Sequence, residues 1–158
     1  LALALVQTLT EELRQKIKSI VLLSPWIDMN PQSEFLVNRI DDDGVLSTET
    51  LLRCGKYYTD EEKLKTPLIS PLYVESFNLK SFPPVYIQCG GDEIILDGVK
   101  AFKSKLEENN IPCILDIWPE MMFLFQMAHE HLPQAHLAIQ RIGLYIQNLN
   151  KSLEQETE

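Results

Sequence analysis

The stretch PPVYIQCGGDEIILD, residues 83–97, decides the fold of this chain. Its first part, Val85–Cys89, is a run of apolar, β-branched and aromatic residues between a proline pair and a glycine pair, which predicts a buried strand that ends in a tight turn. Two carboxylates, Asp92 and Glu93, follow that turn directly. Because open parallel sheets carry their working side chains at the carboxyl ends of strands, this turn is a candidate functional site.

The residues alone leave two roles open for Asp92. A carboxylate in a turn commonly bonds its own backbone, so Asp92 is either a turn former or a catalytic acid. Its neighbour Glu93 is expected to be solvated. Asp97 is expected to cap the helix that the pattern places at residues 98–109.

The rest of the chain repeats the alternation of strand and helix. Further strands are predicted at residues 17–23 and 111–118, and further helices at 1–16, 47–58 (with Ser47 as cap) and 133–149. Continuous apolar strands separated by helices predict an α/β fold with a parallel, three-stranded partial sheet flanked by helices. We expect one domain over residues 1–150 and a frayed acidic tail over 151–158.

Composition excludes several partners. The chain has 158 residues, 45% of them hydrophobic and 23% charged, which is typical of a globular protein. A net charge of −9 disfavours binding to nucleic acid, whose phosphates are also negative. No apolar run is long enough to predict a membrane span. The three cysteines, Cys54, Cys89 and Cys113, lack metal-ligand spacing, so we expect them to be buried free thiols in a reducing compartment. We accordingly expect a cytoplasmic location.

Other acidic and aromatic residues allow more than one interpretation. Asp28 and the run Asp41–Asp43 raise the possibility of a cation site, but adjacent carboxylates in a loop do not converge on an ion, so a solvated loop and no bound metal are expected. Four aromatic residues either line an acyl pocket or simply pack: Trp26, Phe35, Tyr57 and Tyr58.

Several separate motifs occur in one order and spacing. They are LLSPWID (22–28), SPLY (70–73), PPVYIQ (83–88), GDEI (91–94), the pair WP (118–119), Met121 and FQ (125–126). By these motifs the chain resembles the C-terminal half of the hormone-sensitive-lipase-like branch of the α/β-hydrolases, which are serine esterases and lipases. The resemblance extends from Leu1 to about Leu149.

The resemblance implies a role for each part. The nucleophile elbow, Gly-x-Ser-x-Gly, would end a few residues upstream of Leu1, and the glycine-rich oxyanion loop would also lie upstream. Asp92 matches the acid of the catalytic triad, which orients the histidine. The parent protein would hydrolyse a small apolar ester without any metal or organic cofactor.

The histidine of the triad is replaced in this sequence. Family members usually read Gly-Met-x-His after Trp-Pro, whereas this chain reads Glu-Met-Met-Phe, so Phe123 stands at the expected histidine position. A phenyl ring cannot take a proton from a serine hydroxyl. His129, six residues on, reaches that place only if the turn is remodelled. All three histidines are expected to be solvated: His129, His131 and His136.

No serine of the printed sequence has the flanking glycines of an elbow. The nine serines are Ser19, Ser24, Ser33, Ser47, Ser70, Ser76, Ser81, Ser104 and Ser152.

Three hypotheses follow. The chain is an inactive fragment of a carboxylic ester hydrolase, or a catalytically lapsed hydrolase (a pseudoenzyme) kept for binding, or a half-domain that self-associates through its open sheet edge.

Overall fold

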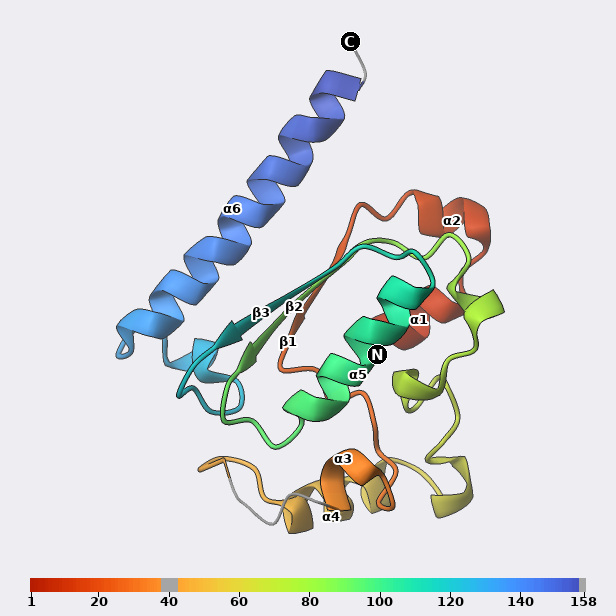
Figure 1. Cartoon of the computed structure of the whole chain (residues 1–158), viewed down its shortest axis with the longest axis vertical. Coiled ribbons are helices and arrows are strands. Elements are labelled where there is room, and N and C mark those ends of the chain that lie inside the picture. The colour runs from red at the N-terminus through yellow and green to blue at the C-terminus, as the bar shows by residue number, and fades with distance from the viewer. Residues whose placement is uncertain (38–42, 157–158) are drawn as a thin grey trace. The chain divides into compact units, whose positions relative to one another are not determined.

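The computed structural model describes residues 1–37 and 43–156 and contains one parallel sheet (Figure 1). The chain divides into two units, Leu1–Phe123 and Leu124–Glu158, which are described separately here. Among the described residues, no helix is both long and apolar enough to cross a membrane.

The sheet consists of β1 (Ile20–Leu23), β2 (Val85–Gly90) and β3 (Cys113–Trp118), hydrogen-bonded in that order. Both pairings are parallel, which confirms the predicted three-stranded parallel sheet. The outer strands are shorter than predicted. Pro112 has no amide hydrogen to give to a neighbouring strand, and β3 begins directly after it.

Within residues 1–37 and 43–123, the first unit contains five α-helices and three short 3-10 helices. They are α1 (Ala2–Thr8), α2 (Glu11–Gln15), α3 (Glu34–Val37), α4 (Thr48–Tyr58), the 3-10 helices Glu61–Lys63, Pro71–Tyr73 and Ser76–Leu79, and α5 (Leu96–Glu108). The predicted cap of α4 is confirmed, because the Ser47 side chain accepts from the Thr50 amide.

Two local predictions were wrong. The opening segment is not one helix to residue 16, because the chain leaves the helical conformation at Leu9 and restarts after Thr10, whose side chain accepts from the Leu13 amide. Asp97 does not cap α5. The helix begins at Leu96, two residues before its predicted start, so Asp97 lies inside its first turn and pairs with Lys100 at 3.0 Å.

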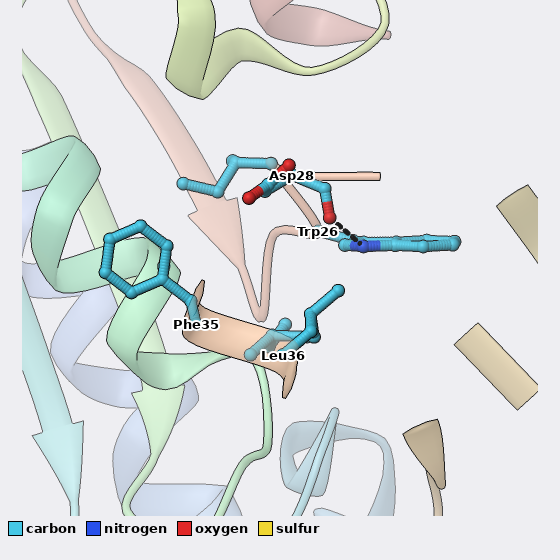
Figure 2. Close-up of a pocket in the computed structure, with 7 residues that line it drawn as sticks. Trp26, Asp28, Phe35 and Leu36 are labelled. Carbon is cyan, nitrogen blue, oxygen red and sulfur yellow. Dashed lines mark hydrogen bonds between the residues drawn. The ribbon is translucent and has the colours of Figure 1, made fainter. Parts of the chain in front are cut away.

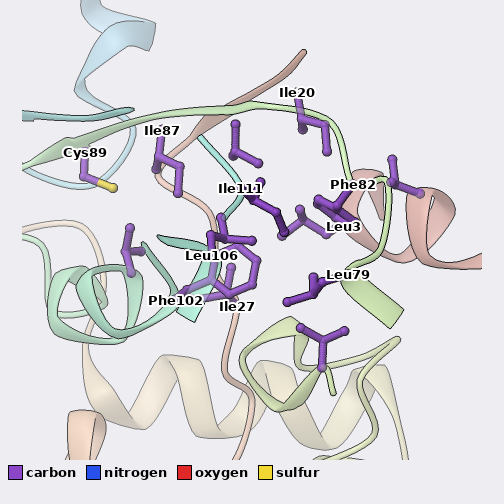
Figure 3. Close-up of a cluster of buried hydrophobic side chains, with 14 of the residues drawn as sticks. Leu3, Ile20, Ile27, Leu79, Phe82, Ile87, Cys89, Phe102, Leu106 and Ile111 are labelled. Atoms are coloured by element: carbon purple, nitrogen blue, oxygen red, sulfur yellow. The ribbon is translucent and has the colours of Figure 1, made fainter. Parts of the chain in front are cut away.

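The main core lies between the sheet and the helices α1 and α5 (Figure 3). Every residue of β2 is buried, because β2 is the central strand. Alternate side chains of β2 point into this core, where they meet Leu3 of α1 and Phe102 of α5. Its buried members are Leu3, Val6, Ile20, Ile27, Val74, Leu79, Phe82, Val85, Ile87, Cys89, Leu96, Val99, Phe102, Leu106 and Ile111.

The second unit consists of the 3-10 helix Phe125–Ala128 and the helix α6 (Pro133–Glu156). The sequence predicted that this last helix ends at Leu149, but it continues seven residues further, to Glu156. No proline or glycine follows Gly143, so nothing in the sequence interrupts helix propagation.

Candidate active site

The turn after β2 holds two carboxylates in opposite environments. Asp92 is exposed, and its backbone N–H donates to the Met121 carbonyl at 3.1 Å. Glu93 has no exposed surface at all. The prediction that Glu93 is solvated is therefore wrong, because the chain turns back toward the sheet at this residue and carries its side chain inward.

Glu93 joins the ends of two neighbouring strands. Its Oε1 accepts from the Ser24 hydroxyl at 2.6 Å and from the Gly90 backbone N–H. Ser24 follows β1 directly, is buried, and has a left-handed backbone with φ of 42°. The Ser24 amide donates to the Gln88 carbonyl at 2.9 Å, which holds the serine beside the end of β2.

Burial raises the pKa of Glu93 to about 7. Desolvation outweighs the hydrogen bonds from Ser24 and Gly90, which lower the pKa, and the charge of Asp43 adds to the rise. Burial also raises the pKa of Cys89, and the charge of Glu93 adds to that effect. Since a thiol nucleophile must ionise, Cys89 is not suited to that role.

The turn at residues 119–123, where the resemblance places the histidine, lies directly against the acidic turn. Gly91 donates its N–H to the Trp118 carbonyl at 2.7 Å. A Cβ on Gly90 would overlap the Met121 carbonyl oxygen, and one on Gly91 would lie 3.1 Å from the Pro119 Cα. Gly90 is therefore required for the close approach of the two turns, and a side chain at Gly91 would fit only tightly.

Phe123 ends this second turn in an apolar environment. It packs, with Trp26 and Leu46, against a small cluster of four buried side chains. The four are Leu36, Leu51, Ile94 and Ile95. The position is thus filled by a hydrophobic side chain that cannot exchange a proton.

The histidines all lie in the second unit and are exposed, as predicted: His129, His131 and His136. His136 Nε2 lies 3.0 Å from the side-chain nitrogen of Gln140, one helical turn further along α6.

The acidic loop is only partly as predicted. Asp41 and Asp42 lie outside the described residues. Asp43 is buried rather than solvated, and its Oδ1 accepts from the amides of Val45 and Leu46. Within residues 1–37 and 43–156, no three His, Cys, Asp or Glu side chains gather as metal ligands would.

Two of the four aromatic candidates line a common pocket. Trp26 and Phe35 border it together with Asp28 and Leu36 (Figure 2). Tyr57 is 85% exposed, whereas Tyr58, although exposed, lines a separate groove together with Trp26. Of the cysteines, Cys89 is buried and Cys113 half-buried, but Cys54 is exposed, contrary to the prediction.

Sequence reasoning missed Ser24 and Glu93 as partners. They are 69 residues apart in the sequence, and only the parallel pairing of β1 and β2 brings them together. The one available signal was that each follows a predicted strand.

Comparisons with known proteins agree with this geometry. A family model described as the alpha/beta hydrolase fold matches residues 1–127. An esterase of Acinetobacter venetianus is 32% identical over 151 residues, which cover 95% of this chain and 49% of the relative. An acetyl-hydrolase of Streptomyces hygroscopicus is 27% identical and is matched over 92% of this chain and 48% of its own length.

Solved structures show the same likeness. An esterase from the bacterial hormone-sensitive lipase family superposes with a TM-score of 0.75 at 30% identity, covering 84% of this chain and 43% of that one. A hormone-sensitive lipase from a metagenome library superposes with a TM-score of 0.76 at 28% identity. The match covers 84% of this chain and 44% of that one. The chain thus spans about half the length of the relatives that it matches. On this evidence the chain belongs to the α/β-hydrolase fold family, in its hormone-sensitive-lipase-like esterase branch.

Proposed function

We propose that this chain supplies the acid and the histidine turn of a serine hydrolase that acts on small apolar carboxylic esters. The observation that carries the proposal is the direct pairing of the two turns, through the amides of Gly91 and Asp92 and the carbonyls of Trp118 and Met121. In a catalytic triad the acid must lie beside the histidine, which it orients and stabilises as imidazolium. The names of the relatives, esterase and acetyl-hydrolase, support the same chemistry.

Two adjacent carboxylates, Asp92 and Glu93, are candidates for the acid of this site. The resemblance assigns the role to Asp92, but its exposure would leave any interaction with an imidazolium screened by water. Glu93 is buried and held by two hydrogen bonds. We therefore assign the acid position to Glu93 and treat Asp92 as the alternative that the experiment below tests.

We further propose that the chain with Phe123 does not turn over esters, because no general base stands in the turn. The packing of Phe123 supports this, since the phenyl ring contacts an apolar cluster that includes Leu36 and Ile95. A lapsed hydrolase that retains only binding is the second candidate function, and the same packing favours it.

The substitution Phe123→His tests the site without any need for a nucleophile. An imidazolium beside a carboxylate lowers the carboxyl pKa and raises its own. We expect carbon-13 NMR titration to show that the pKa of Glu93 falls below its present value of about 7, with no change at Asp92.

Met122→His is the matched control, because it places the same ring on an exposed neighbour in the same turn. It should leave the pKa of Glu93 unchanged. A fall at Asp92 alone would transfer the acid role to Asp92, and no change at either carboxylate would overturn the proposed site.

Ester turnover is tested in a protein that joins this chain to an upstream segment with a serine elbow. Hydrolysis of p-nitrophenyl acetate should stay at background with Phe123 and rise roughly 10²–10⁴-fold with Phe123→His, which is the usual contribution of a general base. Efficient turnover with Phe123, unchanged by the substitution, would show that the base lies elsewhere.

We also propose that the isolated chain self-associates through the outer edge of β1. Among the described residues β1 pairs only with β2, and Leu23 at its end is exposed. A groove of about 210 Å³ beside it is lined by apolar side chains that include Leu1, Pro25 and Leu68. Unpaired strand edges recruit further strands. Sedimentation should show mass that grows with concentration, and a monomer at every concentration would contradict this.

A further inference from the structure

A small pocket lies beside the end of β1, and its residues Trp26, Leu36 and Ile95 belong to the same apolar cluster as Phe123. Its walls are the side chains of Trp26, Phe35 and Leu36, and its floor includes Gly98 of α5 (Figure 2). The enclosed part measures about 10 Å³, which is the room that one water-sized atom needs. With the open space in front, the empty volume is about 220 Å³. A ligand could therefore place one heavy atom inside and its remainder in the mouth.

Asp28 is the polar group of this pocket. Its side chain is 4% exposed. Oδ1 accepts from the Asn30 amide at 3.0 Å, but Oδ2 has no hydrogen-bond partner in the structure. Figure 2 shows the carboxylate directed into the space beside Phe35 and above Leu36. A buried carboxylate oxygen without a partner is costly, and a cation or a hydrogen-bond donor in the pocket would remove that cost.

The surrounding residues do not balance this charge. Tyr73 is a polar neighbour of Asp28 and is neutral. Burial raises the pKa of its hydroxyl, a hydrogen bond from Asn30 lowers it, and both the charge of Asp28 and a side-chain hydrogen bond to Asp28 add to the rise. Within the described part of the chain, none of the ion pairs includes Asp28. The pocket thus combines a buried negative charge with apolar walls.

We propose that this pocket binds the ammonium group of a small primary alkylamine. The ammonium nitrogen fits the enclosed space and donates to Oδ2 of Asp28, and a short alkyl chain lies against Phe35 and Leu36 in the mouth. An inorganic cation would gain nothing from these apolar walls, and a neutral alcohol would leave the carboxylate charge uncompensated. This inference is independent of the proposed ester chemistry, because its test measures binding alone.

Ethylammonium is the probe, and 1-propanol is its neutral counterpart of similar size. The Trp26 indole N–H reports on the site, because it donates to the Asp28 carbonyl at 2.6 Å. A Trp118→Phe background identifies its resonance among the two tryptophans. At constant ionic strength we expect ethylammonium, and not 1-propanol or sodium, to shift the Trp26 signal to saturation. Equal shifts with sodium, or no saturation with ethylammonium, would overturn the proposal.

Two variants change the site in different ways. Asp28→Asn keeps the acceptor for the Asn30 amide and removes the charge, so ethylammonium should bind at least about tenfold more weakly, as happens when one partner of a buried charge pair is lost. Glu34→Gln, an exposed carboxylate beside Phe35, should not change the affinity. If both variants weaken binding equally, general electrostatics and not the pocket is responsible.

If Asp28→Asn does not fold, Gly98→Ala tests whether ethylammonium binds in this pocket. A Cβ on Gly98 would lie 3.9 Å from the Phe35 Cβ, which is ordinary contact, and alanine favours the helix in which it stands. The added methyl group occupies the pocket and leaves Asp28 unchanged. We expect weaker binding of ethylammonium by a folded variant, and unchanged affinity would exclude this pocket as the site.

Discussion

The Ser24 hydroxyl donates a hydrogen bond of 2.6 Å to Glu93, linking the carboxyl ends of β1 and β2 across 69 residues of sequence. Both side chains are buried. This bond fixes the inner side of the acidic turn, and the pairing of that turn with residues 118–121 fixes its other side. The stability of the candidate site should therefore respond to changes at each of these contacts.

Glu93 makes the stability depend on pH. The folded protein holds this proton up to about pH 7, whereas an unfolded chain releases it near the ordinary glutamate pKa of 4.5. Between these values folding takes up a proton, so this contribution to stability is complete below 4.5 and is lost as the pH rises through 7. Glu93→Gln should abolish this dependence, which is on the order of 3 kcal/mol.

Urea denaturation at a series of pH values measures that effect. The unfolding free energy of the wild type should fall relative to that of Glu93→Gln as the pH rises. Asp92→Asn, at the exposed neighbour, should follow the wild type. Parallel curves for the wild type and Glu93→Gln would contradict the raised pKa.

Ser24→Ala removes one of the two donors to Glu93. The carboxyl group remains buried with fewer hydrogen bonds, so its pKa should rise further and the protein should lose about 1–3 kcal/mol of stability. Ser104→Ala on the exposed face of α5 is the control and should be neutral. Equal effects of the two substitutions, measured by urea denaturation, would show that the Ser24 bond does not stabilise the fold.

Gly90→Ala should prevent the two turns from meeting. Its methyl group would overlap the backbone of Met121, which cannot move without opening the turn, so we expect a loss of more than about 3 kcal/mol or failure to fold. In Gly143→Ala the added carbon meets nothing within 4 Å, and the helix should gain about 1 kcal/mol. Thermal unfolding of both variants checks the contrast, and a stable Gly90→Ala protein would refute the close approach.

Glu120→Gly should stabilise the second turn. Glu120 has φ of 59°, a left-handed conformation that costs most residues about 1 kcal/mol and glycine almost nothing. We expect a gain of about 0.5–1 kcal/mol, although glycine is also more flexible in the unfolded chain. Glu108→Gly in helix α5 should instead lower the free energy of unfolding by about 1 kcal/mol, because glycine disfavours the helical conformation. A loss of stability in Glu120→Gly would mean that the glutamate side chain has a role of its own.

The sequence by itself determined the sheet and the place of the site. The apolar run Val85–Cys89, the glycine pair and the order of the motifs fixed three parallel strands and put acidic residues at the end of the central one, because strand periodicity and turn chemistry are local properties. The substitution of Phe123 at the expected histidine position was equally visible in the sequence.

Only the tertiary structure decided which carboxylate is buried. Asp92 and Glu93 are adjacent and chemically alike, so no local pattern distinguishes them. Burial depends on the direction in which the turn carries each side chain, and that direction is set by the packing of Gly90 and Gly91 against residues 119–121. The buried Asp28 and Asp43 were likewise read as solvated loop residues, because carboxylates are usually exposed and their burial arises from segments distant in sequence.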